Sequence, residues 1–363
     1  MSIVITGSHL TPALAVIDEL KKRGEKKIYY LGRRYTLEGV KIPSVESRLL
    51  PKKGVKFIPI PAGRLQRRFT RYTIPSLLRV PLGVLASLYY LLKIRPKAVI
   101  SFGGYVSVPV VFTTRLLGIP SLTHEQTTVL GLANKINSFF ADKIAISFPE
   151  SARFFPRQKT VLTGNPIRKE IFAAQKPLFK LDPKRKTIYI TGGSQGASII
   201  NKNVFAALPW LAKQYNVIHQ CGAKDFPLLK KKKKKLPLDC QEHYFLADYI
   251  FPENIGWVLK KADLVVSRGG ANTITELLAL KKRALIIPIP WTTHHEQEKN
   301  ARLIKKAGLG DILPQEKLTP LALRRQIKKL LSQPLQPTAY LKKFKPRPSA
   351  KLIVDHLYEL LNP

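Results

Sequence analysis

A glycine-rich turn between a strand and a helix occurs twice in this chain, and the repeat limits the possible folds more than any other feature. In residues 188–197, IYITGGSQGA, a β-branched and aromatic strand runs into Gly192 and Gly193, and a helix is expected over residues 198–211. Residues 2–20, SIVITGSHLTPALAVIDEL, have the same layout. Two such openings predict two similar α/β halves.

Each turn leaves the backbone N–H groups of a helix start open, because those donors have no partner within the helix. A terminus of this kind attracts anions, phosphate above all. In the second copy, Ser194 and Gln195 add side-chain hydrogen-bonding groups. A plain turn is the alternative for either loop alone, and the repeat favours a ligand site.

The composition indicates two domains and an anionic partner. The chain has 363 residues, with 62 lysines and arginines against 23 acidic residues, a net charge of +39. Nucleic acid, an anionic membrane face and a phosphorylated substrate all fit this charge, and excess lysine on solvated faces is the alternative. Cys221 and Cys240 have no metal-ligand spacing and form no disulfide framework, which suits a reducing compartment.

Membrane insertion is not predicted. No uninterrupted apolar run reaches the roughly 20 residues of a spanning helix, and the first apolar residues lack a preceding basic region and are better explained as a strand than as a signal peptide. We therefore expect a soluble protein or one that lies on a membrane surface.

Strands and helices are predicted to alternate in two Rossmann-like domains. The strands are expected at residues 3–6, 28–31, 55–60, 98–101, 121–124, 143–147, 188–191, 217–220, 242–246, 263–267 and 284–288. The helices are expected at residues 14–20, 107–117, 132–140, 198–211, 273–280, 300–307, 318–331 and 349–361. The predicted domains are 1–165 and 166–340, with 341–363 crossing back to the first and residues 163–183 forming the linker.

Ligand chemistry is expected at the carboxyl ends of these strands. The G-x-G-x-x-G fingerprint, the P-loop motif and an Asp-x-Asp pair are absent, so a diphosphate would rest on helix N-termini and a cation such as Arg168. Glu276 could accept ribose hydroxyls, or simply favour a helix start. His9, beside the first turn, is the candidate general base, with a structural donor as the alternative.

Two basic segments remain. Residues 64–93 are apolar over most of their surface and fit either a core helix or a membrane-facing one; they begin with the cluster Arg64, Arg67, Arg68 and Arg71, and Leu78, Leu82, Leu85 and Tyr89 follow at near-helical spacing. The run Lys230–Lys235 is expected in a loop or at a helix end, solvated or in contact with phosphates or lipid.

Nine motifs follow one another along the chain: TGSHLTPALAV, SFGGYVSVP, GIPSLTHEQ, GLANK, TGNPIR, GGSQGA, HQCG, GGANTITEL and HHEQEKNA. In this order they resemble the MurG family of bacterial cell-wall synthesis, and the resemblance covers nearly the whole chain. The resemblance implies a GT-B fold with the ligand cleft between the two domains. It also implies inverting, metal-independent and cofactor-free transfer of N-acetylglucosamine from UDP-GlcNAc to lipid I, giving lipid II. The enzyme would be peripheral, on the cytoplasmic face of the plasma membrane.

The resemblance also assigns residues to the site. On the donor side these are Thr6, Gly7, Ser8, Thr127, Arg168, Gly193, Ser194, Gln195, Leu246, Ala271, Asn272, Thr273, Ile274, Thr275, Glu276 and Gln297. On the acceptor side they are Gly104, Tyr105, Glu125, Asn134 and the base His9. The membrane patch comprises Leu78, Leu82, Leu85 and Tyr89, and no metal ligand is assigned.

Two motifs depart from the family, and other functions remain open. The first loop reads VITGSH where the family has GGTGGH, so three glycines are missing and Ser8 replaces one of them; Thr127 replaces an asparagine expected near the sugar. A related enzyme could act on another lipid acceptor or epimerise a UDP-sugar. A non-catalytic protein binding nucleic acid or an anionic surface is the alternative of another class, and the scattered basic residues and the lack of a nucleic-acid motif disfavour a nucleic-acid partner.

Overall fold

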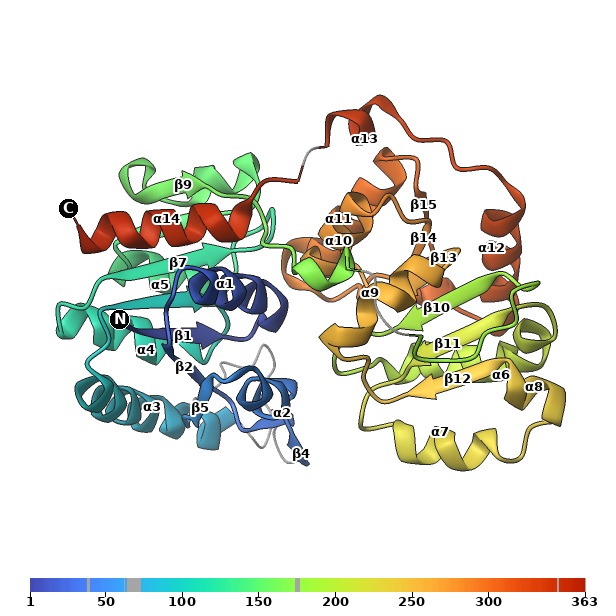
Figure 1. Cartoon of the computed structure of the whole chain (residues 1–363), viewed down its shortest axis with the longest axis horizontal. Coiled ribbons are helices and arrows are strands. Elements are labelled where there is room, and N and C mark those ends of the chain that lie inside the picture. Colours follow the sequence, from blue (N-terminus) through green and yellow to red (C-terminus); the bar gives the residue numbers. More distant parts are fainter. Residues whose placement is uncertain (38–39, 62, 64–72, 174–176, 345, 363) are drawn as a thin grey trace. The chain divides into compact units, whose positions relative to one another are not determined.

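The computed structural model describes residues 1–37, 40–61, 63, 73–173, 177–344 and 346–362. It divides into two compact units, Met1–Arg168 with Pro346–Pro363, and Lys169–Lys345. Each unit has a parallel sheet with helices packed on it (Figure 1). The α/β class predicted from the repeated turn is confirmed. The arginines of the basic cluster, Arg64, Arg67, Arg68 and Arg71, lie outside the described residues.

The first unit is built on a sheet whose central strand is β1. Within the described residues the strand order is β5 (Lys56–Pro59), β2 (Lys27–Gly32), β1 (Ser2–Gly7), β6 (Ala98–Phe102), β7 (Ser121–Glu125), β8 (Lys143–Ile146) and β9 (Thr160–Leu162). β3 (Tyr35–Leu37) and β4 (Val40–Pro43) form a separate antiparallel pair. The helices are α1 (Leu10–Lys22), α2 (Val45–Leu49), α3 (Thr73–Ile94), α4 (Ser107–Leu116), α5 (Leu132–Phe140) and α14 (Ser349–Leu361). Ile3, Val4 and Ile5 are fully buried, as expected for a strand covered on both faces.

The second unit repeats this plan with β10 at the centre. The strand order among described residues is β12 (Tyr244–Ala247), β11 (Asn216–Gln220), β10 (Thr187–Thr191), β13 (Leu264–Ser267), β14 (Ala284–Ile286) and β15 (Gly310–Ile312). The helices are α6 (Ser198–Gln214), α7 (Phe226–Lys233), α8 (Leu238–Glu242), α9 (Pro252–Lys261), α10 (Ala271–Ala279), α11 (Glu296–Lys306), α12 (Pro320–Ser332) and α13 (Ala339–Lys343). Short 3₁₀ helices are η1 (Pro51–Lys53), η2 (Pro149–Phe154), η3 (Arg157–Lys159), η4 (Lys169–Ile171), η5 (Thr293–His295) and η6 (Gln315–Lys317).

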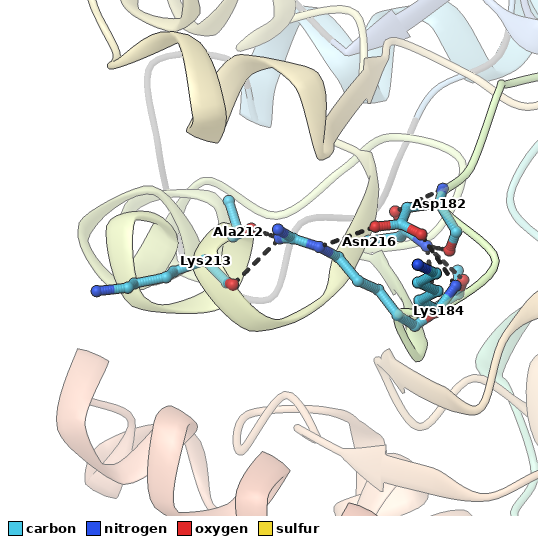
Figure 2. Close-up of polar contacts among 7 residues, drawn as sticks. Asp182, Lys184, Ala212, Lys213 and Asn216 are labelled. Atoms are coloured by element: carbon cyan, nitrogen blue, oxygen red, sulfur yellow. Dashed lines mark hydrogen bonds and ion pairs between the residues drawn. The ribbon is translucent and has the colours of Figure 1, made fainter.

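Hydrogen bonds join residues 182–185, which lead into β10, to the rest of the second unit (Figure 2). Arg185 donates to the carbonyls of Ala212 and Lys213 at 2.7 and 3.1 Å, at the end of α6. Asn216 donates to the carbonyl of Asp182 at 2.8 Å. The end of the predicted linker is therefore part of the second unit, because side-chain donors satisfy its backbone carbonyls.

Several predicted boundaries were wrong; α1, for example, runs over Leu10–Lys22 rather than 14–20. α10 begins at Ala271 rather than 273, and α11 begins at Glu296 rather than 300. The WTTHHEQEKN segment is therefore helical in its second half, after His294 and His295 in left-handed conformations. The predicted strand 242–246 begins only at Tyr244, because Glu242 ends α8.

Helix α3 has one buried face and one exposed apolar face. Leu91 and Ser87 are fully buried. The four patch residues are each more than half exposed: Leu78, Leu82, Leu85 and Tyr89. Their predicted helical spacing is confirmed. The core interpretation holds for the buried face, and the membrane-facing interpretation of the exposed face stays a prediction. None of the described helices is long and apolar enough to cross a membrane.

The last helix, α14, packs on the first unit. Arg23 in the turn after α1 pairs with Asp355 at 2.7 Å, and Tyr358 donates to Glu25 at 2.9 Å. The chain therefore leaves the first unit after Arg168 and returns to it at Pro346.

Candidate functional site

The first candidate edge is formed by the ends of β1, β6 and β7. Ser8 directly follows β1, and its backbone N–H donates to the carbonyl of Gly103 at 2.9 Å. The carbonyl of Gly7 accepts from Tyr30 at 2.8 Å. The buried hydroxyl of Thr6 has no hydrogen-bond partner among the described residues. The Ser8 N–H and the Gly7 carbonyl are therefore both used in hydrogen bonds, and the polar groups of this turn that stay unpaired belong to side chains.

Ser8 faces Gly104 at very short range. A Cβ atom added to Gly104 would lie 2.1 Å from the Ser8 hydroxyl oxygen, and the glycine has a φ of +80°. The Ser8 hydroxyl is buried and unpaired within the described structure. Ser8 therefore fits only because position 104 lacks a side chain, and Tyr105, which follows, is half-buried against the core.

His9 lies between this turn and α1. Its side chain is half-buried and makes no cap hydrogen bond. Burial lowers the pKa of His9 to about 4, with a further contribution from the nearby Arg33 guanidinium. At neutral pH the imidazole is therefore uncharged and able to accept a proton.

A second histidine, His124, lies close enough to His9 that the two side chains interact electrostatically. Its Nε2 atom is 3.0 Å from the carbonyl of Gly164 and must donate there, because a carbonyl only accepts. Its buried Nδ1 is then an acceptor with no partner in the described part of the chain. Burial lowers the pKa of His124 to about 4. The sequence placed His124 at this edge but gave it no role, and its adjacency to Glu125 was the available signal.

Glu125 organises the loop after β7. One carboxylate oxygen accepts from the backbone and hydroxyl of Thr127, both at 3.1 Å. The other accepts from Asn134 at 3.0 Å and from the Gly131 backbone at 3.3 Å. Burial raises the pKa of Glu125, and these hydrogen bonds oppose the rise. Glu125 and Asn134 therefore brace the loop, and the Thr127 hydroxyl is occupied within it.

The second candidate edge begins with the turn after β10. Gly193 donates to Thr191 at 3.0 Å, and Gln220 on β11 donates to the Gly193 carbonyl at 2.9 Å. A Cβ on Gly196 would lie 1.9 Å from the Cys221 carbonyl oxygen, so this position requires glycine. Ser194 and Gln195 stay exposed, and α6 starts without a side-chain cap. This arrangement leaves N–H donors available to an anion.

Gln297 sets the geometry between β13 and α11. Its side-chain oxygen accepts from the backbone of Gly269 at 3.2 Å and of Ile289 at 3.1 Å. These two bonds fix which end of the amide is the oxygen. The amide NH₂ makes no hydrogen bond to other described residues, and Gln297 therefore presents a donor.

Helix α10 carries the largest group of predicted donor contacts. The side chains of Ala271, Ile274, Thr275 and Glu276 are buried, whereas Asn272 and Thr273 are half-buried. Thr275 donates to the carbonyl of Ala271 at 2.8 Å. The backbone N–H of Ile274 donates to the carbonyl of Gly270 at 3.0 Å.

The remaining predicted donor residues are Leu246 and Arg168. Leu246 is half-buried on β12 and pairs with His219 of β11. Arg168 is the last residue of the first unit's opening segment.

Arg268 is a functional candidate that sequence reasoning missed. This buried side chain donates to the carbonyl of Ile287 at 2.9 Å and to the Gln315 side chain at 2.7 Å. Burial lowers its pKa to about 10. It adjoins Gly269, so a buried positive charge lies directly behind the α10 edge. Its position before the Gly-Gly pair was the only sequence signal.

Both units match one glycosyltransferase family. Residues 2–146 match the glycosyltransferase family 28 N-terminal domain, and residues 187–356 match the glycosyltransferase family 28 C-terminal domain.

Named relatives match nearly the full length. A protein of Halalkalibacterium halodurans, named UDP-N-acetylglucosamine--N-acetylmuramyl-(pentapeptide) pyrophosphoryl-undecaprenol N-acetylglucosamine transferase, is 33% identical and covers 92% of each chain. A Bacillus cereus protein of that name, numbered 1, is 35% identical and covers 98% of this chain and 96% of its own.

Solved structures agree with these matches. The crystal structure of Acinetobacter baumannii MurG is 25% identical, with a TM-score of 0.62 over 99% of this chain and all of that one. A UDP-GlcNAc 2-epimerase of Methanocaldococcus jannaschii shares the fold, with a TM-score of 0.60 over 99% of this chain and all of that one, at 10% identity.

Proposed function

The chain belongs to the MurG family within glycosyltransferase family 28, and we propose that it transfers N-acetylglucosamine from UDP-GlcNAc to lipid I. The product is lipid II, an intermediate of peptidoglycan synthesis. The observation that carries the proposal is the contrast between the two edges. One edge offers open backbone donors for a diphosphate, and the other holds an uncharged histidine.

The second unit is proposed to bind the donor. The diphosphate would rest on the N-terminus of α6 beside Ser194, with Arg168 as a counter-charge. The free NH₂ of Gln297 would donate to a sugar oxygen, which is supported by the two backbone bonds that orient its amide. Glu276 would accept the ribose hydroxyls, and the backbone near Leu246 would contact the uracil.

The first unit is proposed to hold the acceptor and the base. His9 takes the proton of the muramyl 4-hydroxyl as its oxygen attacks the anomeric carbon. The bond from that carbon to the diphosphate oxygen breaks, UDP leaves with the electron pair, and the configuration inverts. The lowered pKa of His9 supports this role, because an uncharged imidazole is required.

The membrane side of the function follows from α3. We propose that the exposed stripe Leu78, Leu82, Leu85 and Tyr89 enters the cytoplasmic leaflet, where the lipid acceptor resides. The protein would then be peripheral, held on an anionic surface.

The decisive experiment measures transfer of labelled N-acetylglucosamine to a lipid I analogue, with and without EDTA. We expect labelled lipid II in both samples. UDP-GlcNAc should also raise the temperature of thermal unfolding. If UDP-GlcNAc does not bind and does not raise the unfolding temperature, the proposal fails at its first step. Release of an epimerised UDP-sugar without acceptor, or transfer only to another lipid, would replace it with a related activity.

A further inference from the structure

The lysine segment, residues 226–235, is the most concentrated charge in the described structure outside the candidate edges. It comprises α7 and the two lysines that follow it, Lys234 and Lys235. Lysines 230 to 235 form no ion pair with any described acidic residue. Cations in the last turn of a helix interact favourably with its dipole, but six consecutive ammonium groups also repel one another. The local structure therefore offers no neutralising partner for this charge.

Half of these lysines are held against aromatic rings. The ammonium of Lys230 lies 5.9 Å from the ring centre of Phe226, and that of Lys232 lies 5.5 Å from Phe205 on α6. Lys233 lies 5.7 Å from the ring of Tyr244 and donates to its carbonyl. These contacts anchor the segment on the second unit and cover the rings with the lysine side chains.

The other half are exposed and share a surface with apolar side chains. Lys231, Lys234 and Lys235 are exposed, and their ammonium groups make no hydrogen bond, ion pair or ring contact within the described structure. Leu228 is 57% exposed and lies three positions before Lys231, so these two side chains fall on one face of α7, and Lys235 follows two residues after the helix ends. Leu238, at the start of α8, is 76% exposed.

Helix α8 is held beside the end of the lysine segment. Gln241 donates to the carbonyls of Leu236 and Lys234, at 2.8 and 3.4 Å. The surface therefore combines free ammonium groups with two protruding leucines, the combination that binds at the boundary between lipid headgroups and acyl chains.

We propose that the lysine segment, with Leu228 and Leu238, is a second membrane-contact surface that binds anionic phospholipid headgroups. The positive charge matches the negative surface of a cytoplasmic leaflet, and the leucines gain by entering it. A nucleic-acid partner fits less well, because the segment has no arginine and its rings are covered by lysine side chains rather than open for base stacking. The surface lies on the donor unit, whereas the α3 stripe lies on the other unit, and it goes beyond the proposed reaction.

The test compares two charge-matched variants of the full chain. Lys231→Glu, Lys234→Glu and Lys235→Glu together reverse the free lysines. Lys317→Glu, Arg325→Glu and Lys328→Glu together make the same charge change at exposed residues elsewhere on the second unit. Binding is measured by co-sedimentation with phosphatidylglycerol vesicles and with neutral phosphatidylcholine vesicles.

We expect the first variant to lose affinity for the anionic vesicles by more than about a hundredfold, since losing each lysine near such a surface costs roughly fivefold and the three glutamates add repulsion. The control variant should lose far less, and binding of both to neutral vesicles should match the parent protein. Equal losses in the two variants, or no loss in either, would overturn the proposal. The proposal would also be overturned if the lysine variant lost binding to a model RNA while its binding to anionic vesicles was unchanged.

The same variants separate this proposal from the catalytic one. UDP-GlcNAc affinity, and transfer to a short-chain acceptor in solution, should be unchanged in the lysine variant because the segment lies outside both candidate edges. Transfer to lipid I in anionic vesicles should fall with the loss of binding. Lost activity in every assay, including solution, would mean instead that the segment supports the donor fold.

Discussion

Ser8 and His9 alone separate β1 from α1, whereas residues 192–197 separate β10 from α6. In the short turn, the Ser8 N–H is used by Gly103 and its side chain is wedged against Gly104. In the long turn, Ser194 and Gln195 project into solvent while Gln220 holds the turn from behind. Neither helix start has a side-chain cap, so both leave backbone donors open. The turns differ in the side chains that they present, a wedged serine and a histidine in the short turn and exposed polar side chains in the long one.

The largest expected effect comes from removing the side chain that the short turn positions. His9→Ala should lower kcat by about a hundredfold to ten-thousandfold, the usual range for a general base. The dissociation constant for UDP-GlcNAc should change far less than kcat, because most of the proposed donor contacts, including Ser194, Glu276 and Gln297, lie on the second unit. Steady-state transfer and calorimetric titration measure the two quantities, and an unchanged kcat would remove His9 as the base.

On the donor edge, Gln297→Glu isolates the free NH₂ of this side chain. The carboxylate can still accept from Gly269 and Ile289, but it has no donor for the sugar and adds negative charge near the diphosphate. Affinity for UDP-GlcNAc should fall about tenfold or more, with little change in unfolding temperature.

Gln297→Ala is the matched control for that variant. It strands two backbone N–H groups as well, so it should also destabilise the protein by about 1–3 kcal/mol. If Gln297→Glu bound the donor normally, the proposed sugar contact would be wrong.

A third pair of substitutions tests the wedge at the short turn. Gly104→Ala places a methyl group against Ser8 in a left-handed backbone conformation and should destabilise the protein by about 1–3 kcal/mol. Adding Ser8→Gly should restore the part of the free energy of unfolding that is lost to the clash. The part that is lost to backbone strain at position 104 should remain. Urea unfolding measures both, and a double variant no more stable than Gly104→Ala would show that Ser8 is not the obstacle.

The smallest effect concerns pH. Because the pKa of His9 is lowered to about 4, kcat/KM should hold from neutral pH down past 6.5 and fall only as the base becomes protonated near pH 4. Arg33→Gln removes a repelling charge, so it should raise the pKa of His9 and move this acid limb upward. Arg34→Gln, an exposed neighbour, should not. An acid limb at 6.5 in the parent protein would contradict the burial of His9.

Much of the fold follows from local patterns in the sequence. The buried strands around Ile5 and Ile190 and the ends of α5 and α14 were predicted, because continuous apolar runs and helical periodicity are local signals. The pair β3 and β4 and helix α9 were missed. The two strands are short, and α9 carries Gly256 in its middle, which lowers its helix propensity.

The site was harder to predict than the fold. The sequence places Glu125 and Gln297 after strands. It does not show which atoms of each side chain form hydrogen bonds. Both carboxylate oxygens of Glu125 accept hydrogen bonds from its own loop. In Gln297 only the side-chain oxygen is hydrogen-bonded, and the NH₂ group is not. Such choices depend on backbone groups brought together by the tertiary fold, as does the burial of Arg268.

The return of α14 to the first unit makes the second unit an insertion. Residues 169–345 can be cut out as one continuous piece, whereas the first unit is assembled from the two ends of the chain. A stop codon after residue 345 would therefore remove no part of the donor unit. It would uncover α1 and remove Asp355 and Tyr358, the partners of Arg23 and Glu25, so a truncation after the donor unit would appear as a defect in the unit that precedes it.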